Sequence, residues 1–237
     1  EISNIIKNNN IDIAIFDSEL SPSQMKNLEN ALDCAVLDRT GVILDIFAKR
    51  ANTAEGKLQV ELAQYKYLLP RLSGQGKNLS RQAAAGTASP IGTRGPGETK
   101  LETDRRHIRA RISKLKAETE EIRRVRGEAR RRREKNEIPL VAIVGYTNAG
   151  KSTPLNKITN SDVHTQNRLF DTLDPTTRLF SPDGKHEALL TDTVGFIKNL
   201  PTHLVDAFRA TLEELSFADL VLIVIDASDP NRMFKAK

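Results

Sequence analysis

Tryptophan is absent from this 237-residue chain, and only 5% of the residues are aromatic. Cysteine occurs once, at Cys34, so an internal disulfide and a cysteine-rich metal site are excluded, as is typical of a reducing compartment. Cys34 begins an apolar run and is expected to be an inert core thiol. No apolar run approaches the roughly 20 residues that cross a bilayer, and no signal peptide is visible after Glu1. These absences predict a soluble protein that requires no membrane and resides in the cytoplasm, with an organellar location left open.

Positive charge is present in excess, and it is concentrated in one place. The net charge of the chain is +5, but Asp104 to Lys135 alone carries 14 Lys and Arg against 6 Asp and Glu. The rest of the chain is therefore slightly acidic. Localised basicity of this kind is typical of a surface that binds nucleic acid or anionic lipid.

The first part of the chain, residues 1–54, alternates strand and helix signals. An alternating β-branched run at 11–17 predicts a strand. SPSQ, beginning at Ser21, supplies a helix N-cap, a proline at the first helical position and a glutamine three residues after the cap. A second strand is predicted at 34–38, and Thr40 is expected to cap the helix that follows. This pattern predicts a small α/β subdomain.

Residues 55–136 change to a helical period. Two helices with matching apolar seams are predicted, and they are expected to lie antiparallel as a hairpin. The second should run from about Thr99 to Asn136, on the order of 50 Å, and Pro70 is expected to end or kink the first. The seams are Leu58, Leu62, Tyr65, Leu69 and Leu72, and Leu101, Ile108, Leu115, Ile122 and Ala129.

Residues 137–237 return to an α/β pattern that contains a phosphate-binding motif. GYTNAGKS, from Gly145 to Ser152, matches G-x-x-x-x-G-K-[ST] and follows a predicted strand. Glycines let backbone N–H groups wrap phosphates, Lys151 reaches the outer phosphates, and the Ser152 hydroxyl takes a magnesium position. Strands are predicted at 140–145, 176–180, 187–192 and 218–227, with an amphipathic helix around 203–215.

Two later segments agree with a nucleoside triphosphate site. DTVG, at 192–195, ends a predicted strand, so Asp192 is expected to hold magnesium through water and the Gly195 amide to sense the terminal phosphate. RLFDTLDPTTR, at 168–178, is a polar connector with three threonines, as a switch loop that responds to the γ-phosphate requires. An ordinary loop capped by hydroxyl groups is the alternative interpretation of that connector.

These motifs are specific in combination. GYTNAGKST, LFDTLDPTTR, DTVGFIKNLPTHLVDAFRATLEE and the upstream IGTRGPGETKLETDRR resemble the HflX family of ribosome-associated GTPases, and the similarity extends from about Asp38 to Pro230. The resemblance implies an α/β fold class. An N-terminal α/β domain with a long antiparallel helical hairpin would precede a Ras-like P-loop GTPase domain, C-terminally incomplete here. It also implies GTP or GDP with Mg²⁺ as cofactors and the large ribosomal subunit with its RNA as partner. A monomer is expected.

The expected site has three groups of residues. Lys151, Thr172 and Gly195 are expected to act in catalysis, and Ser152, Thr172 and Asp192 to hold the metal. Thr172 is preferred over Thr176 and Thr177 because the resemblance implies that the threonine of F-x-T-L-D serves magnesium. The nucleotide-binding residues are expected to be Gly145, Tyr146, Thr147, Asn148, Ala149, Gly150, Lys151, Ser152, Thr153, Phe170, Asp171, Thr172, Leu173, Asp174, Asp192, Thr193, Val194 and Gly195.

Several residues depart from the usual pattern. Pro154 replaces a leucine in the first turn after the phosphate loop, where proline is tolerated. Asp171 adds a negative charge near the phosphates, so nucleotide affinity or hydrolysis should fall. Phe196 stands where many GTPases place the glutamine that orients the attacking water, so intrinsic hydrolysis should be slow. Asn148 suggests a K⁺ ion in place of an arginine finger, or else a loop-shaping asparagine.

The base-reading Asn-Lys-x-Asp motif does not occur before Lys237. Guanine specificity therefore rests on the family resemblance alone. A domain that ended here would lack its last strands, so a boundary within a longer protein is expected.

The glycine-rich stretch at 73–98 would lie at the tip of the hairpin. It has no preceding strand and no G-K-S, so a second nucleotide site is not expected, and its length favours a functional loop or a disordered linker. The resemblance implies contact with ribosomal RNA near the peptidyl-transferase region, where backbone and basic groups would bind phosphates. The RNA-binding residues are expected to be Arg81, Arg94, Gly95, Gly97, Lys100, Arg105, Arg106 and Arg109. Arg123, Arg124, Arg126 and Arg130 to Arg133 are also expected to contact phosphates, because acidic partners are few.

The favoured function is a GTPase switch that docks on the large ribosomal subunit. The resemblance further implies that it splits or rescues stalled ribosomes, under stress among other conditions. An RNA-binding ribosome-assembly factor, in which the nucleotide is structural, is the alternative; it predicts RNA affinity that ignores the nucleotide. An adenine-nucleotide enzyme acting on a small molecule is a third hypothesis, and competition between GTP and ATP separates it.

Overall fold

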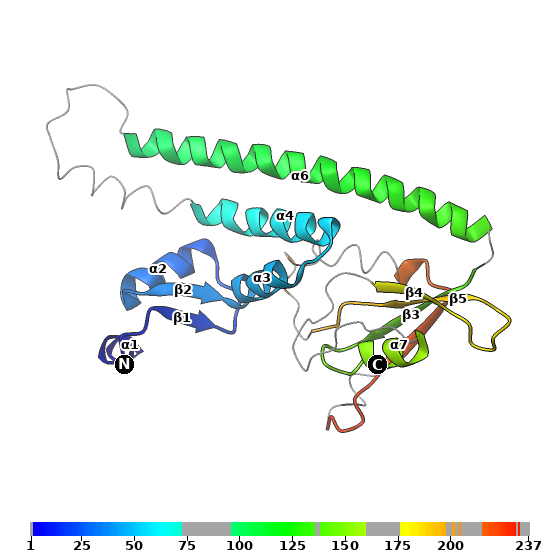
Figure 1. Ribbon diagram of the computed structural model, residues 1–237. Coiled ribbons are helices and arrows are strands. Elements are labelled where there is room, and N and C mark those ends of the chain that lie inside the picture. The colour runs from blue at the N-terminus through cyan, green and yellow to red at the C-terminus, as the bar shows by residue number, and fades with distance from the viewer. Residues whose placement is uncertain are drawn as a thin grey trace, which may run out of the picture. The chain divides into compact units, whose positions relative to one another are not determined.

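The structure is a computed structural model that describes residues 2–72, 96–135, 138–159, 176–197, 201, 204, 215–230 and 232, with the backbone alone at 96–100 and 132–135. The chain divides into two compact units, residues 1–45 with 61–117 and residues 46–60 with 118–237 (Figure 1). The sequence boundaries at residues 54 and 136 follow changes of pattern and stay a prediction.

The first unit begins with a small parallel sheet. Helix α1 spans Ile2–Asn8, strand β1 Ile13–Phe16, helix α2 Pro22–Leu32 and strand β2 Ala35–Asp38. β1 and β2 pair in parallel with Ile13 opposite Ala35. Their core contains Ile6, Leu20, Leu32 and Val36, with Cys34 partly buried against it. Because apolar residues of α1, α2 and both strands meet there, the predicted α/β subdomain is confirmed.

Helix α2 starts as its sequence predicts. The Gln24 N–H donates to the Ser21 hydroxyl at 3.2 Å, and the Ser21 N–H donates to Gln24 Oε1 at 2.9 Å, with Pro22 at the first helical position. Two backbone donors that would lack a helical acceptor are thus satisfied by side chains. Asp33 closes the helix in the left-handed region, with φ of 56°.

The cap of helix α3, Arg39–Arg50, differs from the expectation. Thr40 lies inside the first turn, and its buried hydroxyl finds no hydrogen-bond partner among the residues that the structure describes. Asp38 accepts the N–H of Gly41 at 2.8 Å instead. The prediction of Thr40 as cap was wrong, because a carboxylate one residue before the helix reaches the free N–H first.

Two long helices form the predicted antiparallel hairpin: α4 spans Ala54–Arg71, and α6 spans Pro96–Lys135 (Figure 1). In the first unit Arg111 makes two hydrogen bonds of 2.8 Å to Glu61, and in the second Arg126 lies 2.8 Å from Glu55. Arg126 follows Arg111 along α6, whereas its partner Glu55 precedes Glu61 along α4. The two helices therefore run in opposite directions. α4 ends one residue after Pro70, as expected.

The apolar seam of α6 is real but shorter than predicted. Leu115 is fully buried and Leu101, Ile108 and Ile122 are half-buried, whereas Ala129 is exposed. Ile112, which the seven-residue spacing left out, is also buried. The helix begins at Pro96, three residues before Thr99, so part of the expected tip loop is helical.

The second unit contains a four-stranded sheet in the order β4-β5-β3-β6. Strands β3 (Leu140–Gly145), β5 (Ala188–Asp192) and β6 (Leu220–Val224) are parallel, and β4 (Thr176–Phe180) is antiparallel to β5. These strands lie where the sequence predicts them, whereas the helix around 203–215 falls almost wholly outside the described residues.

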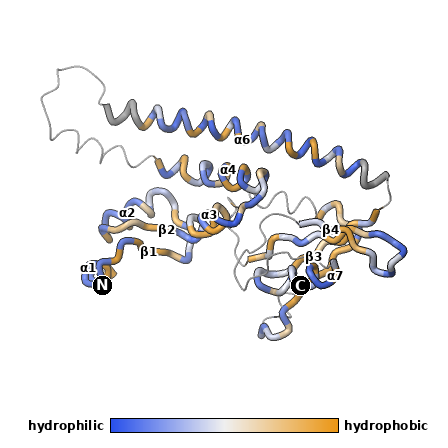
Figure 2. Tube along the Cα trace, viewed as in Figure 1, coloured by the Kyte–Doolittle hydropathy of each residue, from blue (hydrophilic) through white to orange (hydrophobic). Residues whose placement is uncertain are grey.

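Burial across this sheet is uneven. Every residue of β3 is buried, and Val141, Ile143, Leu155 of helix α7 (Ser152–Thr159) and Leu190 form the core. β6 by contrast is exposed from Leu220 to Ile223, and only Val224 is partly buried against this core. Apolar residues dominate β3 and β6, while α6 is mostly hydrophilic (Figure 2). No described helix is long and apolar enough to cross a membrane.

Candidate nucleotide-binding site

The loop from β3 to α7, residues 145–152, lies at the carboxyl end of the central strand, the usual ligand position in an open α/β sheet. A side chain at Gly145 would collide with the carbonyl oxygen of Val224 on β6, so only glycine fits there. Asn148 takes the left-handed conformation, with φ of 63°, and the Ala149 N–H donates to the Tyr146 carbonyl at 3.1 Å. The loop therefore has the sharp turns that a phosphate cradle needs.

Lys151 keeps its ammonium group within this loop. The side chain is 7% exposed, and its Nζ donates to the Tyr146 carbonyl at 2.9 Å. Burial lowers the pKa of the Lys151 ammonium, and the charge of Asp192 opposes this shift. A poorly hydrated cation held within this loop is suited to bind phosphate oxygens.

Ser152 and Asp192 supply oxygen atoms from two different elements. The Ser152 hydroxyl, at the start of α7, donates to Asp192 Oδ2 at 2.6 Å, and Asp192 is the last residue of β5. Mg²⁺ prefers hard oxygen ligands and keeps several waters, so one hydroxyl and one carboxylate fit that ion. This pair is the candidate magnesium site.

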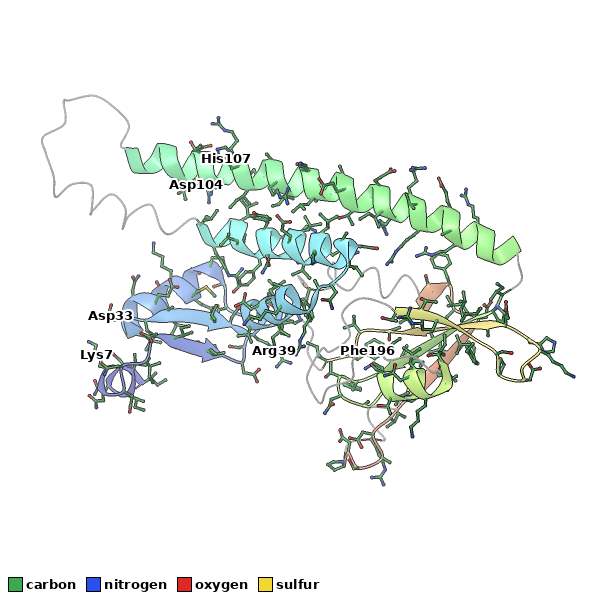
Figure 3. All side chains as sticks on the ribbon, viewed as in Figure 1. Lys7, Asp33, Arg39, Asp104, His107 and Phe196 are labelled. Carbon is green, nitrogen blue, oxygen red and sulfur yellow. The ribbon has the colours of Figure 1, made fainter. Side chains whose placement is uncertain are left out.

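The segment after β5 lies directly on the phosphate loop. The Phe196 N–H donates to the Gly145 carbonyl and the Thr147 N–H donates to the Phe196 carbonyl, each at 2.9 Å. A Cβ at Gly195 would lie 2.5 Å from Thr147 Cα and 2.8 Å from Lys151 Nζ. The absence of a side chain at Gly195 therefore permits the close approach. Phe196, whose side chain is labelled in Figure 3, is 41% exposed.

The structure brings together the expected residues from 145 to 153 and from 192 to 195. Phe170, Asp171, Thr172, Leu173 and Asp174 lie outside the described residues, so their roles stay predictions. The Thr177 hydroxyl lies 3.0 Å from that of Thr191 across β4 and β5, which occupies it within the sheet. Helix α7 forms with Pro154 in its first turn, as expected.

The sequence did not predict two main-chain carbonyl groups that hold site residues, those of Tyr146 and Ile143. The Tyr146 carbonyl holds Lys151, and the Ile143 carbonyl accepts the Thr193 hydroxyl at 2.7 Å. Backbone acceptors of this kind have no residue-type signal, because every residue carries a carbonyl group. Thr193 itself was among the expected nucleotide-binding residues, as part of DTVG.

The arginines of α6 fall into two groups. Arg81, Arg94 and Gly95 lie outside the described residues, and Gly97 and Lys100 lie on α6 without described side chains. Within the part of the chain that the structure describes, Arg105, Arg106 and Arg109 form no ion pair, and the last two are exposed.

The second group corrects a prediction. Arg123, Arg124 and Arg126 were expected to contact phosphates, but each pairs with a carboxylate. Arg124 lies 2.7 Å from Glu121 and 2.6 Å from Glu128, and Arg123 lies 3.2 Å from Glu120. Few acids suffice because a helix brings residues three or four apart to the same face. Arg130 was also expected to contact phosphates, but its guanidinium lies 4.1 Å from the Phe217 ring centroid.

Family models match almost the whole chain. The models described as "GTP-binding GTPase N-terminal", "GTP-binding GTPase Middle Region" and "50S ribosome-binding GTPase" match residues 1–48, 50–133 and 140–236. Their order along the chain follows the subdomain, hairpin and nucleotide-site regions.

Similar proteins agree with these models. The chain is 56% identical to GTPase HflX of Caldanaerobacter subterraneus subsp. tengcongensis, over all of the chain and 54% of that protein. It is 50% identical to GTPase HflX of Escherichia coli (strain K12), over 97% of the chain and 53% of the relative. The chain thus spans about half the length of the curated relatives it matches. The crystal structure of SsGBP in complex with GDP matches 98% of the chain and 60% of its own chain, with 30% identity and a TM-score of 0.52. On this similarity, and on a phosphate loop that carries its expected partners, the chain belongs to the HflX family of GTP-binding proteins.

Proposed function

We propose that this chain binds GTP and GDP with Mg²⁺ and hydrolyses GTP to GDP and phosphate. The observation that carries the proposal is the convergence of Lys151, Ser152, Asp192 and Gly195 where β3 and β5 end. The names of the relatives and the GDP in the SsGBP structure support guanine as the base.

Each residue has a role that follows from its chemistry. The Lys151 ammonium would bind the outer phosphates, and Ser152 and Asp192 would hold Mg²⁺, with Thr172 expected to complete the set. When bound, Mg²⁺ offsets the charge on the phosphate oxygens. The Gly195 N–H would bind the terminal phosphate. Phe196 has no polar side-chain atom to orient the attacking water, so the chain needs help from a partner, its own backbone or a cation.

Potassium is one candidate for that help. Asn148 would hold K⁺ beside the phosphates in place of an arginine finger. Its left-handed φ of 63° favours the alternative, an asparagine that shapes the loop. Faster hydrolysis in potassium than in sodium salts would support the ion, and equal rates would support the loop-shaping role.

The partner is proposed to be the large ribosomal subunit and its RNA. The family description "50S ribosome-binding GTPase" supports this choice, as do Arg105, Arg106 and Arg109, which form no ion pair with any residue that the structure describes. The loop at 73–98 would contact ribosomal RNA near the peptidyl-transferase region, and the factor would split or rescue stalled ribosomes. The triphosphate would favour the bound state and hydrolysis would release it.

Sedimentation with ribosomal subunits tests the switch. We expect co-sedimentation with the large subunit in a non-hydrolysable GTP analogue, and much less in GDP or without nucleotide. K151A should abolish the difference, whereas K185A, an exposed lysine in the β4–β5 hairpin, should leave it unchanged. Binding that ignores the nucleotide would instead favour an RNA-binding assembly factor in which the nucleotide is structural.

Deletion of residues 83–97 tests the loop separately. The deleted chain should keep its affinity for GDP and lose most of its binding to the subunit. If both activities survive, the proposed contact of the loop is wrong. ATP that competes with GTP as well as GTP itself would favour an adenine-nucleotide enzyme.

A further inference from the structure

Thr193 occupies an unusual position, immediately after the last residue of β5. Its side chain is 1% exposed, although the strand ladder has ended. The hydroxyl donates to the Ile143 carbonyl at 2.7 Å, and Ile143 is the β3 residue that pairs in register with Asp192. The Thr193 hydroxyl thus ties the chain to β3 one residue beyond the strand.

This tie fixes the carboxylate of Asp192. The Thr193 N–H donates to Asp192 Oδ1 at 2.9 Å, while Oδ2 accepts the Ser152 hydroxyl at 2.6 Å. The two oxygens therefore have separate donors, and the first is held by the backbone of residue 193. If residue 193 shifted, Oδ1 would lose its donor and the carboxylate would be free to rotate away from Ser152.

We infer that Thr193 is a positioning residue for Asp192, and that its hydroxyl anchors in β3 instead of contacting the nucleotide. The role rests on the proposed function, because it concerns the metal held by Ser152 and Asp192. Residues that orient a metal ligand typically change metal affinity roughly 10- to 100-fold when they are replaced. The hydroxyl carries this anchor because it is the side-chain donor to the Ile143 carbonyl.

The substitution Thr193→Val keeps the shape and removes the donor. Mn²⁺ is a suitable probe because it takes the oxygen ligands of Mg²⁺ and is visible by electron paramagnetic resonance. We expect the T193V chain saturated with GDP to bind Mn²⁺ roughly 10-fold more weakly than the wild type, whereas T193S, which keeps the hydroxyl, binds it like the wild type. If T193V does not fold, T193A removes the same donor without added bulk.

Thr191 provides the matched control. It is fully buried on β5, two residues before Thr193, and its hydroxyl lies against that of Thr177 on β4. T191V should lower the thermal stability about as much as T193V and leave the Mn²⁺ affinity unchanged. Mn²⁺ affinity equal to wild type in T193V, or lowered equally in T191V, would overturn the positioning role. A wild-type chain that binds GDP but no Mn²⁺ would overturn the metal site itself, and one that binds no GDP would overturn the proposed function.

Discussion

Lys151 is costly to keep charged within this loop. Its ammonium is almost excluded from water, and its hydrogen bond reaches only a neutral carbonyl, that of Tyr146. Burial of the charge raises the free energy of the folded state, the nearby charge of Asp192 offsets only part of this cost, and the lowered pKa of Lys151 reflects the balance. A bound phosphate would supply the counter-charge, so the strain favours ligand binding.

Replacing Lys151 by methionine should therefore raise stability while it removes nucleotide binding. We expect Tm to rise by roughly 2–4 °C, with GDP binding lost. Because the folded-state pKa lies below the unfolded value of 10.5, the unfolded chain binds more protons between the two values, and wild-type stability rises with pH there. The advantage of K151M should shrink as pH approaches 10.5. Thermal unfolding of both chains at pH 7 and pH 10 checks this, and a wider gap at pH 10 would contradict it.

Gly195 is a second residue whose role can be isolated. In G195A the new Cβ would meet Thr147 Cα at 2.5 Å, so the two segments must separate. A displacement near 1 Å at reacting groups costs on the order of 100-fold in rate, and GTP hydrolysis should fall by that amount. G127A, a half-buried position on α6 with no atom within 4 Å of the added Cβ, should hydrolyse GTP normally. Single-turnover rates compare them; a normal rate in G195A would refute the close-approach argument.

At the scale of elements, Asp38 joins four parts of the first unit. Its carboxylate accepts the N–H groups of Leu20 and Gly41 and the hydroxyl of Tyr67, and it pairs with Arg71 at 3.2 Å. Burial, and then the hydrogen bond to Asp38, raises the pKa of Tyr67 well above its usual value. The end of β2 thus links α3 to the far end of α4.

Loss of the Asp38 charge should be severe. D38N would leave the Arg71 guanidinium without its buried counter-ion, which costs roughly 3 kcal/mol of unfolding free energy. D17N removes the partner of Arg39 from an aspartate that is 91% exposed, so it should cost less than about 1 kcal/mol. Denaturant unfolding measures both, and equal losses would show that the Asp38 network adds nothing beyond a surface pair.

The elements also show which features a sequence can predict. The start of α2 was predictable because Ser21 and Gln24 satisfy each other within one turn. The start of α3 was not, because Asp38 is buried by contacts with α4 that lie far away in the sequence. The phosphate loop and the segment from Asp192 were found from sequence motifs. Phe196 and Ile143 form their hydrogen bonds at the site through backbone atoms, which every residue carries, so no residue pattern predicts these bonds.

At the scale of the whole molecule, the arginines of α6 fall into two groups: some form ion pairs with glutamates, and others have no such partner among the described residues. Arg111 and Arg126 pair with Glu61 and Glu55 of α4 and stabilise the hairpin, whereas Arg124 pairs with Glu121 within α6. The arginines nearer the 73–98 loop have no such partner among the described residues. The net charge of the helix therefore overstates the number of side chains available to RNA, since paired arginines would have to break their ion pairs first.

Salt dependence separates the two groups. Each phosphate contact adds roughly 0.7–0.9 to the slope of log K against log salt, so R105Q/R106Q/R109Q should reduce that slope by about 2–3 for large-subunit RNA. R123Q/R124Q removes two charges that are already neutralised on the helix, so the slope should stay near the wild-type value while Tm falls slightly. Filter binding of ribosomal RNA between 50 and 200 mM salt, a range over which such contacts change affinity strongly, measures both variants. A uniform loss per arginine removed would mean that RNA senses only net charge, and the division of α6 into paired and available arginines would then be wrong.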